Sequence, residues 1–196
     1  MNTTNEDSLV HQGTITIDYG DGTSCSSSHV RKGKIADNFN TVGLWKNDDL
    51  TITTDETITL TGYYRDSVSV DGVITSNSKS GESSYDVEAK NVKITYSDGS
   101  TLSYSGTYTY EDQDYSTEMT GTWSGLNRKG SEFTAKTTAK VVYKYSCKNS
   151  DTLEAVSGTI EEKTGDKVSV VDYGDGTCDN EYTITTDGKT VKYTFD

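Results

Sequence analysis

The sequence predicts an all-β protein, an antiparallel meander of roughly 10–13 short strands with essentially no helix. Three observations support this prediction. Apolar and polar residues alternate with a period of two along most of the chain. Threonine and serine are abundant, and threonine fits the pleated surface of a strand. Five Asp-Gly pairs, which are strong signals for tight hairpin turns, punctuate the alternating segments. The strands are expected to form a β-sandwich, a flattened barrel or one long curved sheet.

The N-terminal half contains several alternating segments. Residues 13–20 (GTITIDYG) place Ile15 and Ile17 on one face. Residues 68–75 (VSVDGVIT) and the first part of 90–111 (KNVKITYSDGSTLSYSGTYTYE) each carry an Asp-Gly pair between apolar residues, which predicts hairpins. Residues 82–93 (ESSYDVEAKNVK) come closest to a helical pattern, but their Val, Tyr and Ser content favours a strand.

The C-terminal half continues the same pattern. Strands are expected at residues 139–147 (AKVVYKYSC), 152–162 (TLEAVSGTIEE) and 167–174 (KVSVVDYG). Residues 181–196 (EYTITTDGKTVKYTFD) read as a final hairpin with its turn at Asp187 and Gly188.

The composition bounds the core and the domain organisation. Only 31% of residues are hydrophobic, and the aromatic residues are 14 Tyr, 3 Phe and 2 Trp. Tyrosine needs a hydrogen-bond partner or a wet edge for its hydroxyl, so broad sheets with thin, tyrosine-filled cores are expected. No linker or shift in composition marks a domain boundary. Residues 12–196 are therefore predicted to form a single all-β domain after a flexible N-terminal tether at residues 1–11.

The net charge of −13 excludes several kinds of partner. It argues against nucleic acid, whose phosphates attract basic patches, and against adhesion of a protein surface to anionic lipid. No apolar run is long enough to predict a membrane-spanning helix, and no signal peptide is visible.

The hexapeptide DYGDGT occurs twice, at residues 18–23 and 172–177. Turn chemistry explains every residue of it, because Asp-Gly forms a turn and a second aspartate or threonine caps nearby amides. We therefore predict that it turns corresponding corners of the fold and that there is no cofactor. The alternative is bound calcium, since carboxylates stand at short spacing, although the EF-hand pattern is missing. The candidate calcium ligands are Asp18, Asp21, Asp172, Asp175 and Asp179.

Three cysteines permit one disulfide and one free thiol. If the strands around residues 139–174 follow one another as a meander, Cys147 and the loop holding Cys178 lie at the same end of the sheet. This predicts a disulfide between Cys147 and Cys178. The alternative pairs Cys25 with Cys178 and would tie the two DYGDGT segments together. Either bridge implies an oxidising compartment such as the periplasm or the cell surface.

No catalytic residues are predicted, and the chain is expected not to be an enzyme. Cys25 and His29 are close in sequence, but nothing in their polar surroundings orients the imidazole. Scattered cysteines do not supply a zinc site. Acidic residues are plentiful, so a secreted glycan hydrolase that uses two carboxylates remains the alternative.

Aromatic rings are the candidate ligand-binding residues: Trp45, Tyr63, Tyr64 and Trp123. Exposed rings beside polar groups are how many β-sandwich modules hold sugars or protein partners. Tyr63 and Tyr64 should point to opposite faces of a strand. The alternative is that these rings form the core of a chain that is short of aliphatic residues.

Five segments together resemble a group of surface lipoproteins of the Bacteroidota whose function is unassigned. They are TITIDYGDGTSC, RKGKI, GLNRKGSEFTA, YKYSC and DYGDGTCDNEYTIT. The resemblance covers both ends and the last third of the chain, whereas residues 41–115 match only in general character. It implies an exported all-β protein at the outer-membrane surface or outside the cell. It also implies that the membrane is reached only through a lipid on a cysteine upstream of this chain.

The expected function is therefore that of a non-catalytic cell-surface protein, a binding, adhesion or structural envelope module. It is expected to be a monomer whose ligand is a glycan or protein at the cell surface. The alternatives are the glycan hydrolase named above and a stabilising spacer without a ligand.

Overall fold

The computed structural model describes residues 7–25, 29–46, 49–65, 67–149 and 152–195. These residues contain thirteen strands and no helix, and the strands pair in an antiparallel manner, mostly with sequence neighbours. The all-β class and the antiparallel meander are thus confirmed. Within this described part of the chain, no helix has the length and apolar character needed to span a membrane.

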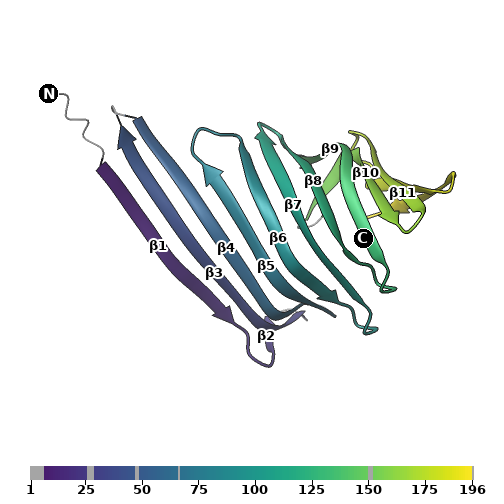
Figure 1. The fold of residues 1–196 in the computed structure, drawn as a ribbon, viewed down its shortest axis with the longest axis horizontal. Coiled ribbons are helices and arrows are strands. Elements are labelled where there is room, and N and C mark those ends of the chain that lie inside the picture. Colours follow the sequence, from purple (N-terminus) through teal and green to yellow (C-terminus); the bar gives the residue numbers. More distant parts are fainter. Residues whose placement is uncertain (1–6, 26–28, 47–48, 66, 150–151, 196) are drawn as a thin grey trace. The chain divides into compact units, whose positions relative to one another are not determined.

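The chain divides into two compact units, Met1–Ser103 and Tyr104–Asp196, where the sequence predicted a single domain. In unit 1 the strand order is β1-β3-β4-β5-β6, and the short β2 also pairs with β3. The bounds are β1 (Asp7–Asp18), β2 (Thr23–Cys25), β3 (His29–Lys46), β4 (Asp49–Arg65), β5 (Val68–Lys79) and β6 (Ser84–Thr95). These strands lie side by side in one layer (Figure 1).

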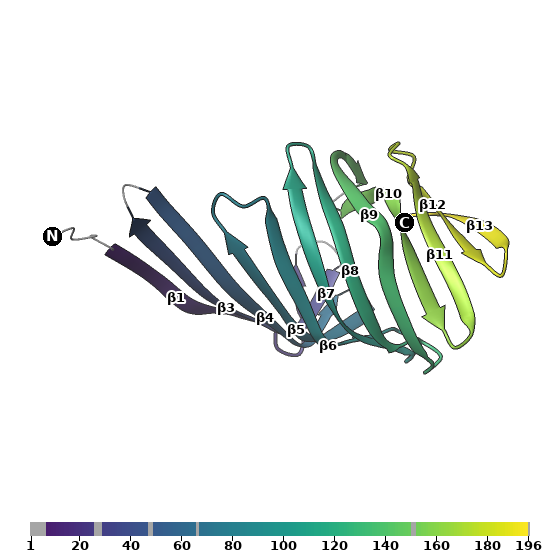
Figure 2. The same cartoon turned by 45° about the horizontal axis from the view of Figure 1, so that its top comes forward.

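Unit 2 contains the rest of the meander in the order β7-β8-β9-β10-β11-β12-β13 (Figure 2). The first strand, β7 (Thr101–Gln113), begins in the last residues of unit 1. The others are β8 (Ser116–Leu126), β9 (Glu132–Asn149), β10 (Thr152–Thr164), β11 (Lys167–Asp175), β12 (Glu181–Thr186) and β13 (Lys189–Thr194). Of the arrangements that the sequence left open, an open meandering sheet is the one that this strand order matches.

The tether expected at residues 1–11 differs from the structure over residues 7–11, which belong to β1. Asp7 is paired with Trp45 and His11 with Thr41, in a register that continues without a bulge to Asp18. The alternation of polar and apolar residues is weak here, and the strand is held by its backbone pairing with β3. Residues 1–6 lie outside the described part of the chain.

The register of unit 1 separates its two faces. One row across the strands joins Ile17, Ile35 and Leu60, and the next joins Ile15, Asp37 and Ile58. We call this side the apolar face of unit 1. Its apolar members are Leu9, Ile15, Ile17, Ile35, Phe39, Trp45, Leu50, Ile52, Ile58, Leu60 and Ile74.

The opposite side of unit 1 is mostly polar, although Val10, Val42 and Leu44 lie on it, and hydrogen bonds link its polar side chains across strands. Thr14 Oγ1 donates to Asn38 Oδ1 over 2.6 Å, and Asn77 Nδ2 donates to Asp55 Oδ1 over 2.5 Å. A one-residue slip in register would move these groups to the apolar face, so the pattern fixes the pairing.

A line of β-bulges crosses unit 1. The register shifts in β3 between Lys32 and Lys34, in β4 between Leu60 and Tyr63, and in β5 between Asp71 and Val73. The hairpin predicted at Asp71-Gly72 is therefore wrong, because this pair lies inside β5. Gly72 is needed there because a Cβ would lie 2.9 Å from the Cα of Val92 on the neighbouring strand.

Two other Asp-Gly pairs do form hairpin turns. Asp187 and Gly188 have φ angles of 52° and 74° and join β12 to β13 at the predicted turn, and two positive φ angles are typical of type I′ geometry. Asp98 and Gly99 lie in a longer turn, in which Gly99 N donates to Tyr96 O over 2.9 Å.

The core of unit 2 is thin, as the composition predicted. Its buried apolar residues come from β8, β9 and β10, and of the large side chains that the structure describes, Val141 alone is fully enclosed. Half-buried tyrosines extend this core, and burial raises the pKa of each. They are Tyr104, Tyr108, Tyr110, Tyr143 and Tyr173.

Candidate functional site

The first DYGDGT segment interrupts an edge strand. β1 ends at Asp18, whose Oδ1 accepts a hydrogen bond from Gly20 N over 2.8 Å. Tyr19 N still donates to Gly33 O over 2.9 Å, and the chain then resumes pairing with the same strand β3 as β2. The hydrogen bonds of the turn are as predicted, but the prediction that this copy turns a corner of the fold is wrong. This segment lies along one edge of β3 and not at the hairpin between two strands.

The second DYGDGT segment ends β11 and leads into the loop before β12. Asp172 Oδ1 accepts from Gly174 N over 2.9 Å, which repeats the contact of the first copy. Asp175 Oδ1 accepts from both the backbone N and the Oγ1 of Thr177. These hydrogen bonds lower the pKa of the Asp175 carboxyl. This copy therefore does turn a corner.

Four of the five aspartates proposed as calcium ligands accept hydrogen bonds from backbone amides. Asp18, Asp172 and Asp175 accept as described above, and Asp179 Oδ1 accepts from Glu181 N over 3.2 Å. In the described parts of the chain, no three or more His, Cys, Asp or Glu side chains gather as metal ligands would. Asp21 is exposed.

Cys147 and Cys178 form a disulfide with a Cα–Cα distance of 5.3 Å. Cys147 is buried in β9, and Cys178 lies in the loop between β11 and β12. Lys144 Nζ donates to Gly176 O over 2.5 Å and ties the same loop to β9. The predicted pairing is confirmed, and Cys178 is not paired with Cys25. Such a bridge is typical of an oxidising environment.

Three of the four candidate aromatic residues pack against neighbours. Tyr63 lies 6.1 Å from the ring of Tyr19, and the Lys32 ammonium lies 5.4 Å from the ring of Tyr64. Trp123 lies 5.6 Å from the ring of Tyr108 on unit 2. All three are partly buried, so they fit the alternative that rings fill thin cores.

Trp45 is the exception, with 48% of its surface exposed. It lies at one end of the apolar face of unit 1, opposite Leu50 on β4. In the adjacent row, Leu9 and Ile52 flank Gly43, and the Leu50 side chain lies over that glycine. We call Leu9, Trp45, Leu50 and Ile52 the Trp45 patch. All four side chains are exposed, Leu9 the most at 72%.

Sequence reasoning found Trp45 but missed the aliphatic residues around it. Leu50 and Ile52 alternate with polar residues in the segment DLTIT, which shows that they share a face. Their grouping with Leu9 depends on a pairing between residues more than thirty positions apart, which no local pattern reveals.

The apolar face also carries a buried polar atom. Asp37 lies between Ile15 and Ile58 in its row, and its Oδ1 is buried without a hydrogen-bond partner among the described residues. An unsatisfied buried acceptor is uncommon and calls for a donor from outside this face.

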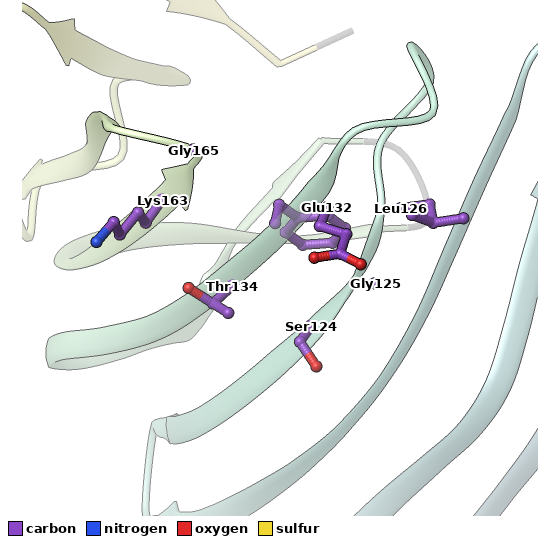
Figure 3. Close-up of a pocket in the computed structure, with 8 residues that line it drawn as sticks. Ser124, Gly125, Leu126, Glu132, Thr134, Lys163 and Gly165 are labelled. Carbon is purple, nitrogen blue, oxygen red and sulfur yellow. The ribbon is translucent and has the colours of Figure 1, made fainter.

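A second candidate is an open pocket of about 790 Å³ at one end of unit 2 (Figure 3). It lies where β8, β9 and β10 meet the turn at Gly165. It is lined by Ser124, Gly125, Leu126, Glu132, Phe133, Thr134, Lys163 and Gly165. Hydroxyl groups and two opposite charges could hold a small polar molecule here. Glu132 is the one carboxylate in the lining, whereas glycoside hydrolysis commonly uses two.

Comparison with known proteins adds no relative: no family model matches the chain, and neither a curated protein nor a solved structure does.

Proposed function

We propose that this chain is a non-catalytic binding module, exported to the outer-membrane surface or beyond, that holds a protein partner through the apolar face of unit 1. The observation that carries the proposal is the exposed Trp45 patch. Apolar side chains from three neighbouring strands are gathered there on one side of a single layer. Contiguous exposed apolar surface of this kind marks interaction sites, whereas single exposed residues do not.

A protein partner suits this face better than a glycan does. Sugar sites combine an aromatic ring with several polar groups that bond hydroxyls. Trp45 is instead surrounded by Leu9, Leu50 and Ile52. The unsatisfied Asp37 carboxylate elsewhere on the face supplies one polar point, which a lysine, arginine or amide donor of the partner would satisfy.

Export and anchoring belong to the same proposal. The disulfide between Cys147 and Cys178 supports an oxidising compartment. Attachment to the membrane would come from a lipid upstream of this chain, as the sequence resemblance implies. The pocket of unit 2 contains a single carboxylate, so we propose no hydrolase activity from it.

The test is a binding screen against extracellular proteins and glycans by surface plasmon resonance, with matched variants. The double variant Trp45→Ser/Leu50→Ser should lose binding at least tenfold, because it removes the centre of the patch. Tyr115→Ser is the control, since Tyr115 is 82% exposed but lies on unit 2. Equal binding by wild type and double variant would contradict the proposed site. A screen without any protein partner would favour the spacer.

A further inference from the structure

We propose that two copies of this chain associate by pairing the outer edges of their β1 strands in an antiparallel manner, centred on Gly13. The proposal concerns the edge of the sheet and does not depend on the ligand of the apolar face. It departs from the monomer expected from the sequence, because β1 begins at Asp7 and forms a twelve-residue edge strand where a tether was expected up to residue 11.

The edge of β1 is long and unprotected. β1 pairs regularly with β3 from Asp7 to Asp18, and no described strand pairs with its other side. Between Ser8 and Ile17 it contains no proline, lysine, arginine or acidic residue. Natural sheets protect such edges with charges, proline, bulges or very short strands, and an edge without them is a template for pairing.

The free edge of unit 2 shows the protection that β1 lacks. β13 is six residues long and carries Lys189 and Lys192. The ammonium of Lys192 pairs with Glu181 of β12. The two edges belong to one chain, so the difference between them points to a specific use of β1.

The backbone of β1 directs its free hydrogen-bonding groups outward in a regular series. Tyr19 N donates to Gly33 O on β3, so the odd-numbered amides face β3. The even-numbered residues from Ser8 to Asp18 therefore present their N–H and C=O groups to the open edge. With Gly13 opposite Gly13 of the second copy, each of these even-numbered residues faces another even-numbered residue, and all six form paired hydrogen bonds.

This register also matches side chains. Leu9 would lie opposite Ile17 of the second copy, and His11 opposite Ile15, all on the apolar face. Asp18 would face Ser8, so no two carboxylates oppose each other. The Phe39 ring already covers Gly13, where a Cβ would lie 2.9 Å from Phe39 Cζ, so the two rings would flank the axis. Any odd shift would place apolar residues against the polar face.

The association should be moderate and should depend on salt. The paired edge is about 37 Å long, which is a narrow contact compared with a standard interface. Each copy carries a net charge of −13, so repulsion opposes pairing at low ionic strength. Added sodium chloride should therefore strengthen the dimer.

The first experiment is sedimentation velocity over a concentration series with the variants Gln12→Pro and Thr190→Pro. Gln12→Pro removes an outward amide of β1, and Thr190→Pro removes an outward amide of β13. On β13, Phe195 N donates inward to Asn180 O, so the odd-numbered amides face β12 and the even-numbered amides, including that of Thr190, face outward. Wild type and Thr190→Pro should form a concentration-dependent dimer, and Gln12→Pro should stay monomeric. A wild type that is monomeric at every concentration, or a Gln12→Pro variant that dimerises like it, would overturn the proposal.

A second measurement keeps the test valid if Gln12→Pro fails to fold. In a Cys25→Ser background, Gln12→Cys should be cross-linked between copies by a short bis-maleimide. Val10→Cys should not be cross-linked, because the two Val10 positions would be about 20 Å apart along the strands. Equal cross-linking of both variants, or of neither, would overturn the β1 pairing.

Discussion

Gly33 on β3 lies directly against Gly62 on β4: a Cβ on Gly33 would be 2.2 Å from the carbonyl oxygen of Gly62. Gly33 has a φ of 75° and Gly62 a φ of 54°, so both also use backbone conformations that favour glycine. The contact lies where the bulges of β3 and β4 meet. At this point in the line of bulges, the backbones of β3 and β4 are therefore in direct contact, with no room for a side chain between them.

Gly33→Ala should lower the free energy of unfolding by more than about 3 kcal/mol, because the added methyl meets backbone that cannot move aside. Gly81→Ala is the matched control, since Gly81 has a similar φ of 82° but no atom within 4 Å of its Cβ position. It should cost only the conformational term of about 1–2 kcal/mol. Urea denaturation measures both, and equal losses would show that crowding at Gly33 is unimportant.

Asp71→Ala should cost about 1–2 kcal/mol of stability. Asp71 Oδ1 accepts a hydrogen bond from Gly62 N over 2.6 Å, and this bond joins the bulges of β4 and β5. Asp71→Asn should restore part of the loss, because its amide oxygen can also accept. If Asn and Ala prove equally destabilising in thermal and urea melts, the hydrogen bond is not the cause.

Reduction of the disulfide should destabilise unit 2 by about 3–4 kcal/mol, as chain-entropy arguments give for a separation of 31 residues. Cys147→Ser should behave like the reduced protein, whereas Cys25→Ser should match the oxidised wild type. The measurement is urea denaturation with and without reductant. An unchanged midpoint on reduction would contradict this prediction.

Stability should fall as the pH rises above about 10, the ordinary pKa of tyrosine. Burial raises the pKa of Tyr143 and of the other core tyrosines of unit 2, so they hold their protons in the folded state. Above the unfolded pKa, the unfolded chain binds fewer protons and is favoured. Ultraviolet titration of the phenols, followed together with circular dichroism, should show late ionisation accompanied by unfolding.

Tyr143→Phe should shift this alkaline transition to higher pH, because one buried proton no longer has to be released. Tyr115→Phe removes the hydroxyl of an exposed ring and should leave the transition in place. A transition that responds equally to both substitutions would mean that burial of Tyr143 is not what links pH to folding.

Periodicity was sufficient to predict the class, the meander and the final hairpin. The alternation of apolar and polar residues and the Asp187-Gly188 turn depend only on residues that are close in sequence, so the sequence pattern is enough to predict them. The Cys147–Cys178 disulfide was predicted from the meander order, with Cys25–Cys178 as the alternative. The bulges could not be predicted, because Asp71-Gly72 has the same sequence signature as a turn. What distinguishes it is Val92, a residue of the next strand.

The candidate site was predicted only in part for the same reason. Trp45 was visible as an aromatic residue, but its local sequence does not show that 48% of its surface is exposed. The half-buried tyrosines of unit 2 agree with the expected tyrosine-filled core, whereas Tyr63 and Tyr64 were named as candidate ligand-binding rings with core filling as the alternative. Leu9 was assigned to a tether, since its partner Gly43 is far along the sequence.

The interruption at Tyr19–Gly22 sets a length limit on the open edge of unit 1. Because the chain turns there before β2 resumes, any polypeptide added along β1 must stop near Asp18. A strand paired with β1 could therefore not shift its register far along this edge, as it could along an uninterrupted one. The first DYGDGT segment thus limits the length of the β1 edge that is available for backbone pairing.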